Sequence, residues 1–342
     1  MIKYSVIIPA YNCAKTIENT VGSILMSGLI DFEIVIVDDG STDGTGKICD
    51  EMGLQHGCIR CVHQKNAGVS AARNRGIKEA AGEYVWFFDA DDSVDESALC
   101  GIADIISEKS PDMLIFGISF DYYFSGKMYR RDELYYDDEG VLTAKKWSEL
   151  LLPMFASNSL STVCNKFIKR EIIIGHKIRF NEKIFEMEDF LFVINCLTHC
   201  DGIYMLPKAI YRYKQTETGK NTYNRLCRVD SLTDYMKPFE DALTELEENL
   251  GKRGIALADR EKVVNEIYLM LFREQIYFAE TEGIKKAASD MLGGKYAEVV
   301  KNTLPVLYGE LANGKFEKVH LRYMKSRLRH FAAVRYKYLR SL

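Results

Sequence analysis

The stretch Gly82-Glu-Tyr-Val-Trp-Phe-Phe-Asp-Ala-Asp-Asp92 joins an apolar run to a cluster of carboxylates. Its first part, Tyr84–Phe88, is apolar throughout, which is typical of a strand in a parallel sheet that is covered on both faces. In open parallel α/β sheets, ligands bind at the carboxyl ends of the strands. The carboxylates that follow this strand therefore stand where a ligand is expected.

The acidic cluster has two interpretations. Three carboxylates within four residues repel one another unless a cation or hydrogen-bond donors offset their charge. Carboxylate oxygens suit Mg²⁺ or Mn²⁺, which are commonly held by a few carboxylates and the phosphates of a substrate. The alternative is an acidic N-terminus for a helix that begins near Glu96, with Ser93 as its cap. The cluster alone leaves both open.

Two earlier strands also end in polar residues. The run Tyr4–Pro9 leads into Ala10-Tyr-Asn12, and Phe32–Val37 leads into Asp38-Asp-Gly-Ser-Thr-Asp43. Turn chemistry explains any one of these endings, because Asp, Gly and Ser dominate turns. Three such endings at one sheet edge are better explained by a common ligand.

The fold class predicted by this alternation is α/β, with a mostly parallel sheet and flanking helices. Helices are expected at Thr16–Ser27, Thr45–Met52 and Gly68–Ala81, and further strands at Ile59–His63, Met113–Ser119 and Ile203–Tyr213. Two devices that bind nucleotides elsewhere are missing: there is no P-loop, and no G-x-G-x-x-G follows the first strand. A P-loop kinase or a dehydrogenase is therefore not expected.

Beyond about residue 215 the pattern changes. Arg225–Leu250 and Arg260–Thr281 have the periodicity of long amphipathic helices. We therefore expect an α/β catalytic domain over residues 1–215 and a helical C-terminal region over 216–342. That region ends in a tail, residues 315–342, with nine Lys or Arg and one acidic residue, Glu317.

The bulk composition indicates a cytoplasmic protein. The formal net charge of -4 does not suit a polycation that coats nucleic acid. Met1-Ile-Lys3 leads directly into a strand, without the pattern of a signal peptide, and no apolar stretch approaches the roughly 20 residues that cross a bilayer. The nine cysteines are scattered and odd in number, which favours reduced thiols.

One group of potential zinc ligands is His56, Cys58, Cys61 and His63. Residues 58–63 read as a short strand, and alternate residues of a strand point to opposite faces. Cys58 and Cys61 would then point apart, so an ordinary strand is favoured over a zinc site formed by these four residues.

Four segments in order resemble family 2 glycosyltransferases, which are inverting enzymes with the GT-A fold. They are Ser5-Val-Ile-Ile-Pro-Ala-Tyr-Asn12, Val37-Asp-Asp-Gly-Ser-Thr-Asp43, Asn66-Ala-Gly-Val-Ser-Ala-Ala-Arg-Asn-Arg-Gly76 and Gly82–Asp92. The resemblance is strong over residues 4–120 and continues weakly to about 215. It implies transfer of a sugar from a nucleotide diphosphate sugar, with UDP expected, to an acceptor hydroxyl of a growing glycan in bacterial polysaccharide synthesis.

The resemblance also implies roles for the residues at the first two strand ends. Residues lining the nucleoside pocket would be Pro9, Ala10, Tyr11 and Asn12. Asp39 would accept a hydrogen bond from uracil N3–H, with Asp38 as its neighbour in the motif.

Further roles concern the diphosphate. Arg73 would face the nucleotide from its helix, and a guanidinium there is a good phosphate partner. Asp89 and Ala90 would lie at the nucleotide, and Asp91 would bind a divalent metal, Mn²⁺ or Mg²⁺, with Asp89 as a possible second ligand.

The general base is expected in Phe185-Glu-Met-Glu-Asp-Phe190, because in the family an aspartate opens a helix some ninety residues after the D-x-D motif. Asp189 is the first candidate and Glu188 the second. The plainer interpretation is that acidic residues at a helix start stabilise its dipole. Two other functions remain open, a non-catalytic sugar-nucleotide or glycan binding module and a nucleotidyltransferase.

The basic tail interleaves Lys and Arg with aromatic residues and leucine, a composition that suits an interfacial helix on anionic lipid. A lipid-linked glycan acceptor would place the enzyme there. The alternative is a basic helix packed against the acidic remainder of the chain. We favour peripheral contact with the inner face of the membrane.

Overall fold

The computed structural model describes residues 3–124, 126–135, 139–156, 160–216, 229 and 231–322. The chain divides into two compact units. The first comprises Met1–Asp121, Arg131–Gln215 and Glu245–Ala258, and the second comprises Tyr122–Arg130, Thr216–Thr244 and Asp259–Leu342.

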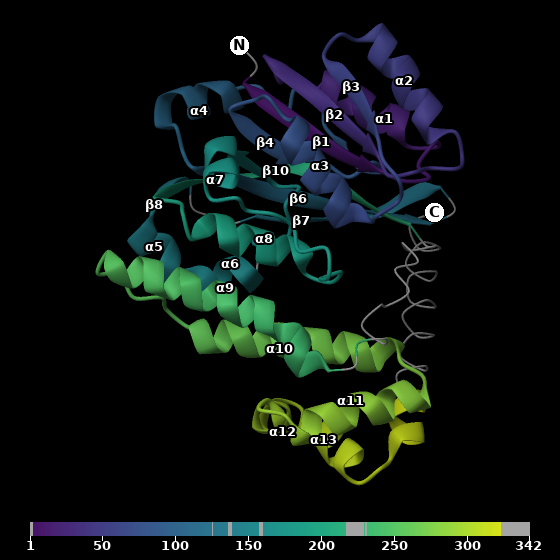
Figure 1. Cartoon of the computed structure of the whole chain (residues 1–342), viewed down its shortest axis with the longest axis vertical. Coiled ribbons are helices and arrows are strands. Elements are labelled where there is room, and N and C mark those ends of the chain that lie inside the picture. The colour runs from purple at the N-terminus through teal and green to yellow at the C-terminus, as the bar shows by residue number, and fades with distance from the viewer. Residues whose placement is uncertain are drawn as a thin grey trace. The chain divides into compact units, whose positions relative to one another are not determined.

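A mixed sheet forms the centre of the first unit (Figure 1). Its strand order is β3-β2-β1-β4-β9-β6-β10-β5. The four parallel strands are β1 (Tyr4–Ala10), β2 (Phe32–Asp38), β3 (Ile59–His63) and β4 (Tyr84–Phe87). Their apolar runs predicted them, and the α/β class with a mostly parallel sheet is confirmed.

The sheet continues with strands that the sequence pattern showed only in part. Next to β4 lies β9 (Lys166–Lys169), which is antiparallel to both β4 and β6 (Met113–Phe124). The others are β5 (Ser93–Val94), β7 (Lys127–Leu134) beside β6, β8 (Gly140–Thr143) and β10 (Gly202–Thr216).

Helices cover both faces of the parallel strands, because alternate residues of a strand point to opposite faces. Ile34 and Ile36 of β2 belong to the core that also contains the apolar stripe of α1 (Ile17–Leu25). Val35 and Val37 cluster instead with Ala72 of α3 (Val69–Glu79), on the near face in Figure 1.

Helix α3 sits close to the sheet because Gly76 has no side chain. A Cβ at Gly76 would lie 2.2 Å from Cγ2 of Ile7 in β1. This close packing fixes how far the residues of α3, among them Arg73, lie from the sheet. The remaining helices of the unit are α2 (Thr45–Gln55), α4 (Ile102–Lys109), α5 (Ala144–Glu149), α6 (Leu151–Ala156), α7 (Arg170–Gly175) and α8 (Glu188–Leu197).

The alternative interpretation of the acidic cluster, a helix that begins near Glu96 with Ser93 as its cap, is wrong. Ser93 and Val94 form β5, which pairs with Arg212 and Tyr211 of β10. The next helix, α4, begins only at Ile102. The strand that displaces the helix comes from more than 100 residues later in the chain, so no local pattern reports it.

The second unit is built mainly from helices. They are α10 (Arg260–Phe278), α11 (Thr281–Gly293), α12 (Ala297–Thr303) and α13 (Pro305–Ala312), while α9 (Leu232–Lys252) belongs to this unit as far as Thr244. Asp290 accepts the backbone N–H groups of Leu232 and Thr233, which caps the start of α9. Among the described residues, no helix is both long and apolar enough to cross a membrane.

The basic tail is described only as far as Arg322. Lys318 and Arg322 both form ion pairs with Glu310 of α13, and Val319 is fully buried. Burial alone would raise the pKa of Glu310, but the hydrogen bonds from Lys318 and Arg322 outweigh it and lower that pKa. The start of the tail thus packs against an acidic residue, and residues 323–342, which hold most of the tail's basic side chains, lie outside the described residues.

Candidate active site

The first two strand ends are joined by hydrogen bonds. The parallel register sets Ala10 beside Asp38, and the backbone N–H of Asp39 donates to the carbonyl of Ala10 at 2.8 Å. Asn12, at a left-handed φ of 49° that Asn tolerates, receives the Thr42 N–H on Oδ1 at 2.8 Å and donates its own N–H to Ser41 at 3.0 Å. The loops after β1 and β2 therefore form one connected edge.

At this edge the side chain of Tyr11 is exposed to solvent and that of Ala10 is not. Tyr11 is 52% exposed, so its ring is available to a ligand, whereas the side chain of Ala10 is buried in the core below. Pro9 lies in β1, and its backbone pairs with Val37. A nucleoside would therefore meet the Tyr11 ring and the backbone of its neighbours.

Asp39 fastens the loop that precedes α3. Its Oδ1 accepts hydrogen bonds from Gln64 Nε2 at 2.7 Å and the Ala67 N–H at 2.9 Å, and Oδ2 accepts the Gly68 N–H at 2.8 Å. The carboxylate is nearly fully buried. Asp39 thus holds the start of the arginine-bearing helix, a role the sequence pattern did not reveal; its contact with uracil stays a prediction.

Asp38 is turned toward the neighbouring strand. Its Oδ1 accepts the Ser41 N–H at 3.0 Å, and its Oδ2 lies 2.9 Å from Nδ1 of His63. Burial would raise the pKa of Asp38, but these hydrogen bonds outweigh it and lower that pKa. The same pairing, together with Asp50, raises the pKa of His63 to about 9.

The acidic cluster after β4 is anchored through Asp92. The Tyr211 hydroxyl donates to Asp92 Oδ2 at 2.6 Å and accepts the Asp89 N–H at 3.1 Å, while the Lys214 N–H donates to Asp92 Oδ1 at 2.9 Å. Asp92 is buried, whereas the side chain of Asp89 is 23% exposed and Asp91 is partly exposed. Donors from β10 therefore offset the charge of Asp92, and the side chains of Asp89 and Asp91 are partly exposed, so a ligand can reach them.

The residues of this turn fit a divalent metal of the Mg²⁺ or Mn²⁺ class. The donor set at Asp89 and Asp91 consists of carboxylate oxygens, which these cations prefer. Within the described residues this turn forms no cluster of three ligand residues. An incomplete protein donor set is usual for a cation that takes its remaining ligands from substrate phosphates and water.

Arg73 connects the acidic turn to the start of α8. Its Nη2 lies 3.1 Å from Asp89 Oδ1, and its Nη1 lies 2.7 Å from Asp189 Oδ1 and 3.4 Å from Glu188 Oε1. The side chain is only 6% exposed. Burial would lower the pKa of Arg73, but the three carboxylates outweigh it and raise that pKa, so the guanidinium stays charged.

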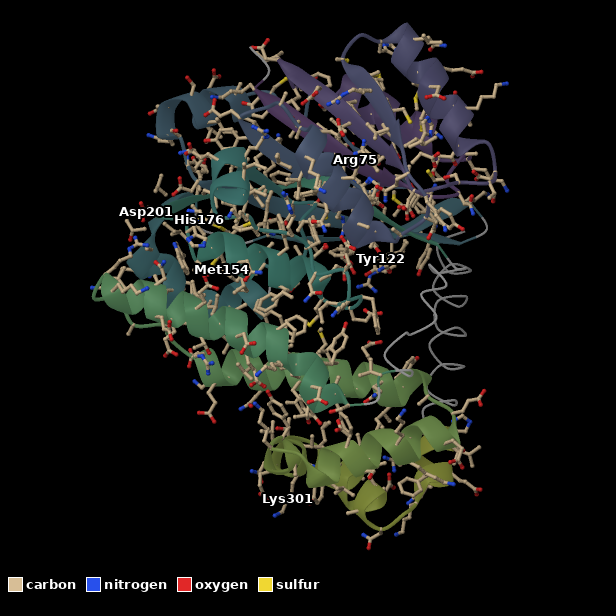
Figure 2. The ribbon with its side chains drawn as sticks, in the orientation of Figure 1. Arg75, Tyr122, Met154, His176, Asp201 and Lys301 are labelled. Atoms are coloured by element: carbon tan, nitrogen blue, oxygen red, sulfur yellow. The ribbon has the colours of Figure 1, made fainter. Side chains whose placement is uncertain are left out.

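Arg75 shows by contrast how specific this placement is. It lies two residues further along α3 (Figure 2), its side chain is 42% exposed, and it pairs with Glu79 of its own helix at 2.8 Å. The sequence predicted Arg73 as a partner of the nucleotide; its ion pairs with Asp89 and Asp189 were not predicted, because they join residues 16 and 116 positions apart.

Asp189 stands in the first turn of α8, which starts after Met187 at a left-handed φ of 63°. The Val163 N–H donates to its second oxygen at 3.2 Å. Burial and the charges of Glu188 and Asp89 raise the pKa of Asp189 to about 7, against the lowering effect of Arg73 and this N–H. A carboxylate with a pKa near neutrality is suited to accept a proton from a hydroxyl.

Two buried residues hold neighbours of Arg73 and Asp189 in place, and the ring of Phe180 lies 5.3 Å from the Arg73 guanidinium. Asn74, next to Arg73 on α3, donates to the Phe180 carbonyl at 3.0 Å and accepts the Phe180 N–H at 2.9 Å. Lys166, fully buried, donates to the carbonyl of Thr162 at 2.5 Å, beside the Val163 N–H that reaches Asp189.

Comparison with known proteins shows which family the chain resembles. The family described as Glycosyl transferase family 2 matches residues 5–175. "Uncharacterized glycosyltransferase EpsJ" of Bacillus subtilis is 29% identical over 211 residues, and the match covers 62% of this chain and 60% of EpsJ. "Cholesterol galactosyltransferase" of Borreliella burgdorferi is 28% identical over 284 residues, covering 80% of this chain and 76% of that protein.

Among solved structures, S. aureus TarS in complex with UDP aligns with a TM-score of 0.63 and 19% identity, covering 95% of this chain and 92% of that chain. At this level of identity, the similarity shows the fold alone. The family match spans half of the sequence and includes β1 to β4 with all three polar strand ends. This chain belongs to glycosyl transferase family 2.

Proposed function

We propose that this protein is an inverting glycosyltransferase that moves a sugar from a UDP-sugar to an acceptor hydroxyl of a growing cell-surface glycan. The observation that carries the proposal is the position of Arg73, which touches Asp89 of the acidic turn and Asp189 of α8 at once. In this proposal the metal and phosphate site and the proton acceptor lie on two sides of one guanidinium.

In this proposal Asp189 takes the proton from the acceptor hydroxyl. The pKa near 7 leaves a substantial share of Asp189 as the carboxylate at neutral pH and keeps it basic enough to receive a proton. The deprotonated hydroxyl then attacks the anomeric carbon on the face opposite the nucleotide. One such displacement inverts that carbon and needs no covalent intermediate with the enzyme.

The donor side consists of Tyr11, the loop fastened by Asp39, and the acidic turn. When bound, a divalent metal held by Asp91, with Asp89 as a second ligand, would neutralise charge on the departing diphosphate. TarS has been solved with UDP and with UDP-GlcNAc, and it shares the fold, so UDP is the nucleotide to test first. A cytoplasmic enzyme at the inner face of the membrane would meet both this donor and a lipid-linked acceptor.

Calorimetry with UDP in the presence and absence of Mn²⁺ tests the donor side. We expect UDP to bind more tightly with the metal, and this gain to disappear in Asp91→Ala. Arg75→Gln, an exposed change at a residue that pairs with Glu79 of its own helix, is the matched control and should bind as the wild type does. Equal affinity for UDP with and without metal in the wild type would refute the metal-assisted donor site.

A further inference from the structure

A second group of metal-type ligands lies beside β3, apart from the acidic turn. Within the part of the chain that the structure describes, the ligand atoms of Asp50, Cys61 and His63 lie within 4.8 Å of one another. Cys61 and His63 are two residues apart on β3 and share a face, and Asp50 comes from α2. His56 and Cys58, which the sequence places in the same H-x-C-x-x-C-x-H segment, are not part of this group.

The distances suit one tetrahedral cation. His63 Nε2 lies 3.1 Å from Asp50 Oδ1 and 3.8 Å from Cys61 Sγ. With usual Zn–N, Zn–O and Zn–S bond lengths, the corresponding edges of a tetrahedron are about 3.3 Å and about 3.6 Å. The side chains of Asp50 and His63 are 57% and 49% exposed, so an ion can enter without opening the fold.

The surroundings of the three ligands are those of a prepared site. Asp38 Oδ2 lies 2.9 Å from His63 Nδ1, so this nitrogen can carry the proton while Nε2 faces the ion. Metal-binding histidines are usually oriented by such a carboxylate. Gly46 of α2 makes room for the pair, because a Cβ there would lie 2.8 Å from Asp38 Oδ2 and 3.3 Å from His63 Cε1.

We propose that Asp50, Cys61 and His63 form a zinc site, with the fourth position open to water. A thiolate, a carboxylate and a neutral imidazole carry two negative charges, which match one divalent ion. A thiolate ligand selects a softer metal such as Zn²⁺ over Mg²⁺, so this site and the all-carboxylate turn at Asp91 prefer different cations. Binding releases the protons of the Cys61 thiol and of His63 Nε2 to solvent.

The site does not depend on the proposed transferase activity. Through His63 and Asp38 it is connected to the Ser41 N–H in the turn after β2. The ion would therefore fix the strand end from which that turn starts. Without a metal, a protonated His63 forms ion pairs with Asp38 and Asp50, and this arrangement is the alternative to a zinc site.

Titration of the full-length, reduced protein with Co²⁺ under anaerobic conditions and excess Mg²⁺ tests the proposal. We expect one equivalent of Co²⁺ to give a thiolate-to-cobalt band in the near ultraviolet and the intense visible bands of tetrahedral Co²⁺. One equivalent of Zn²⁺ should displace it. Cys61→Ser should lose the thiolate band, and Asp50→Asn should weaken binding by at least about tenfold.

Cys58→Ser is the matched control, since Cys58 is also partly buried and lies three residues away but outside the group. It should keep the full spectrum. Asp50 is exposed, so its variant reports on the site even if Cys61→Ser folds poorly. Absence of the thiolate band in the wild type would show that His63 and Asp50 form an ion pair only, and persistence of the band in Cys61→Ser would show that another thiolate binds the ion; either result overturns the proposal.

Discussion

At the scale of single residues, replacing Asp189 by Asn tests the chemistry most directly. Asn has nearly the same shape and cannot accept the proton of the acceptor hydroxyl. We expect transfer to fall by about 10²–10⁴-fold, the usual contribution of a positioned proton acceptor, while UDP binding is retained. Single-turnover transfer and calorimetry on the same sample separate the two effects. Turnover at the wild-type level in Asp189→Asn would show that Asp189 is not the base, and Glu188 would then be the next candidate.

Glu188 supplies a second test through the pH dependence of the rate. Because the pKa of Asp189 is raised to about 7, the wild-type kcat/KM should rise with pH up to about 7 and then level off. The charge of Glu188 contributes to that raised pKa, so Glu188→Gln should lower it. The acidic limb of the profile should then move to lower pH. A limb that stays in place, or moves to higher pH, contradicts this coupling.

The roles of single residues were only partly accessible from sequence. The residue types at the strand ends indicated nucleotide and metal chemistry, because carboxylates there need a cation or donors to offset them. The pattern could not show that Asp92 is anchored by Tyr211, 119 positions later, or that Arg73 reaches Asp189. These contacts depend on how β10 and α8 pack beside β4 and α3, and no local periodicity encodes that packing.

At the scale of elements, β10 holds the acidic turn through the Tyr211 hydroxyl, so Tyr211→Phe should loosen that turn. It removes a donor to the buried Asp92 carboxylate and the acceptor of the Asp89 N–H. The expected loss is about 1–3 kcal/mol in the free energy of unfolding, together with weaker metal-dependent UDP binding. Urea unfolding and calorimetry measure the two.

Tyr204→Phe, on the same strand, is the control for this change. Its hydroxyl donates to Glu139, at a distance of 3.0 Å and away from the acidic turn. It should leave UDP binding unchanged. If both tyrosine variants weaken metal-dependent UDP binding equally, the anchoring of the acidic turn by Tyr211 does not explain the weaker binding.

The elements themselves were predicted where their signals are local. The strand Ile59–His63 has the predicted bounds. Helices α1, α2 and α3 begin and end within three residues of their predicted bounds. Apolar runs and turn residues in the local sequence made these elements predictable. β9 was missed, since it is a four-residue strand inserted between β4 and β6 from later in the chain. The absent helix at Glu96 has the same cause, since pairing with β10 overrides a local capping pattern.

At the scale of the whole molecule, the remaining question is whether the basic tail brings the enzyme to a membrane. Lys318 and Arg322 already pair with Glu310, and Val319 is buried, so the tail as far as Arg322 is part of the second unit. Residues 323–342 contain six Lys or Arg and no Asp or Glu, interleaved with aromatic residues and leucine. We expect this last segment to supply the attraction, at about 1 kcal/mol for each basic residue near an anionic surface.

The test must therefore remove only that segment, because ending the chain before Lys315 would also break the pairs with Glu310 and expose the side chains around Val319. Full-length protein should co-sediment at low salt with liposomes rich in anionic lipid and should bind neutral liposomes far less. It should be released from the anionic liposomes as the salt concentration rises, because screening weakens the electrostatic attraction. A chain ending at Arg322 should stay in the supernatant while it unfolds at the same temperature as the full-length protein. If both chains sediment equally, or neither does, the segment is not an anchor, and the acceptor must be met without help from the tail.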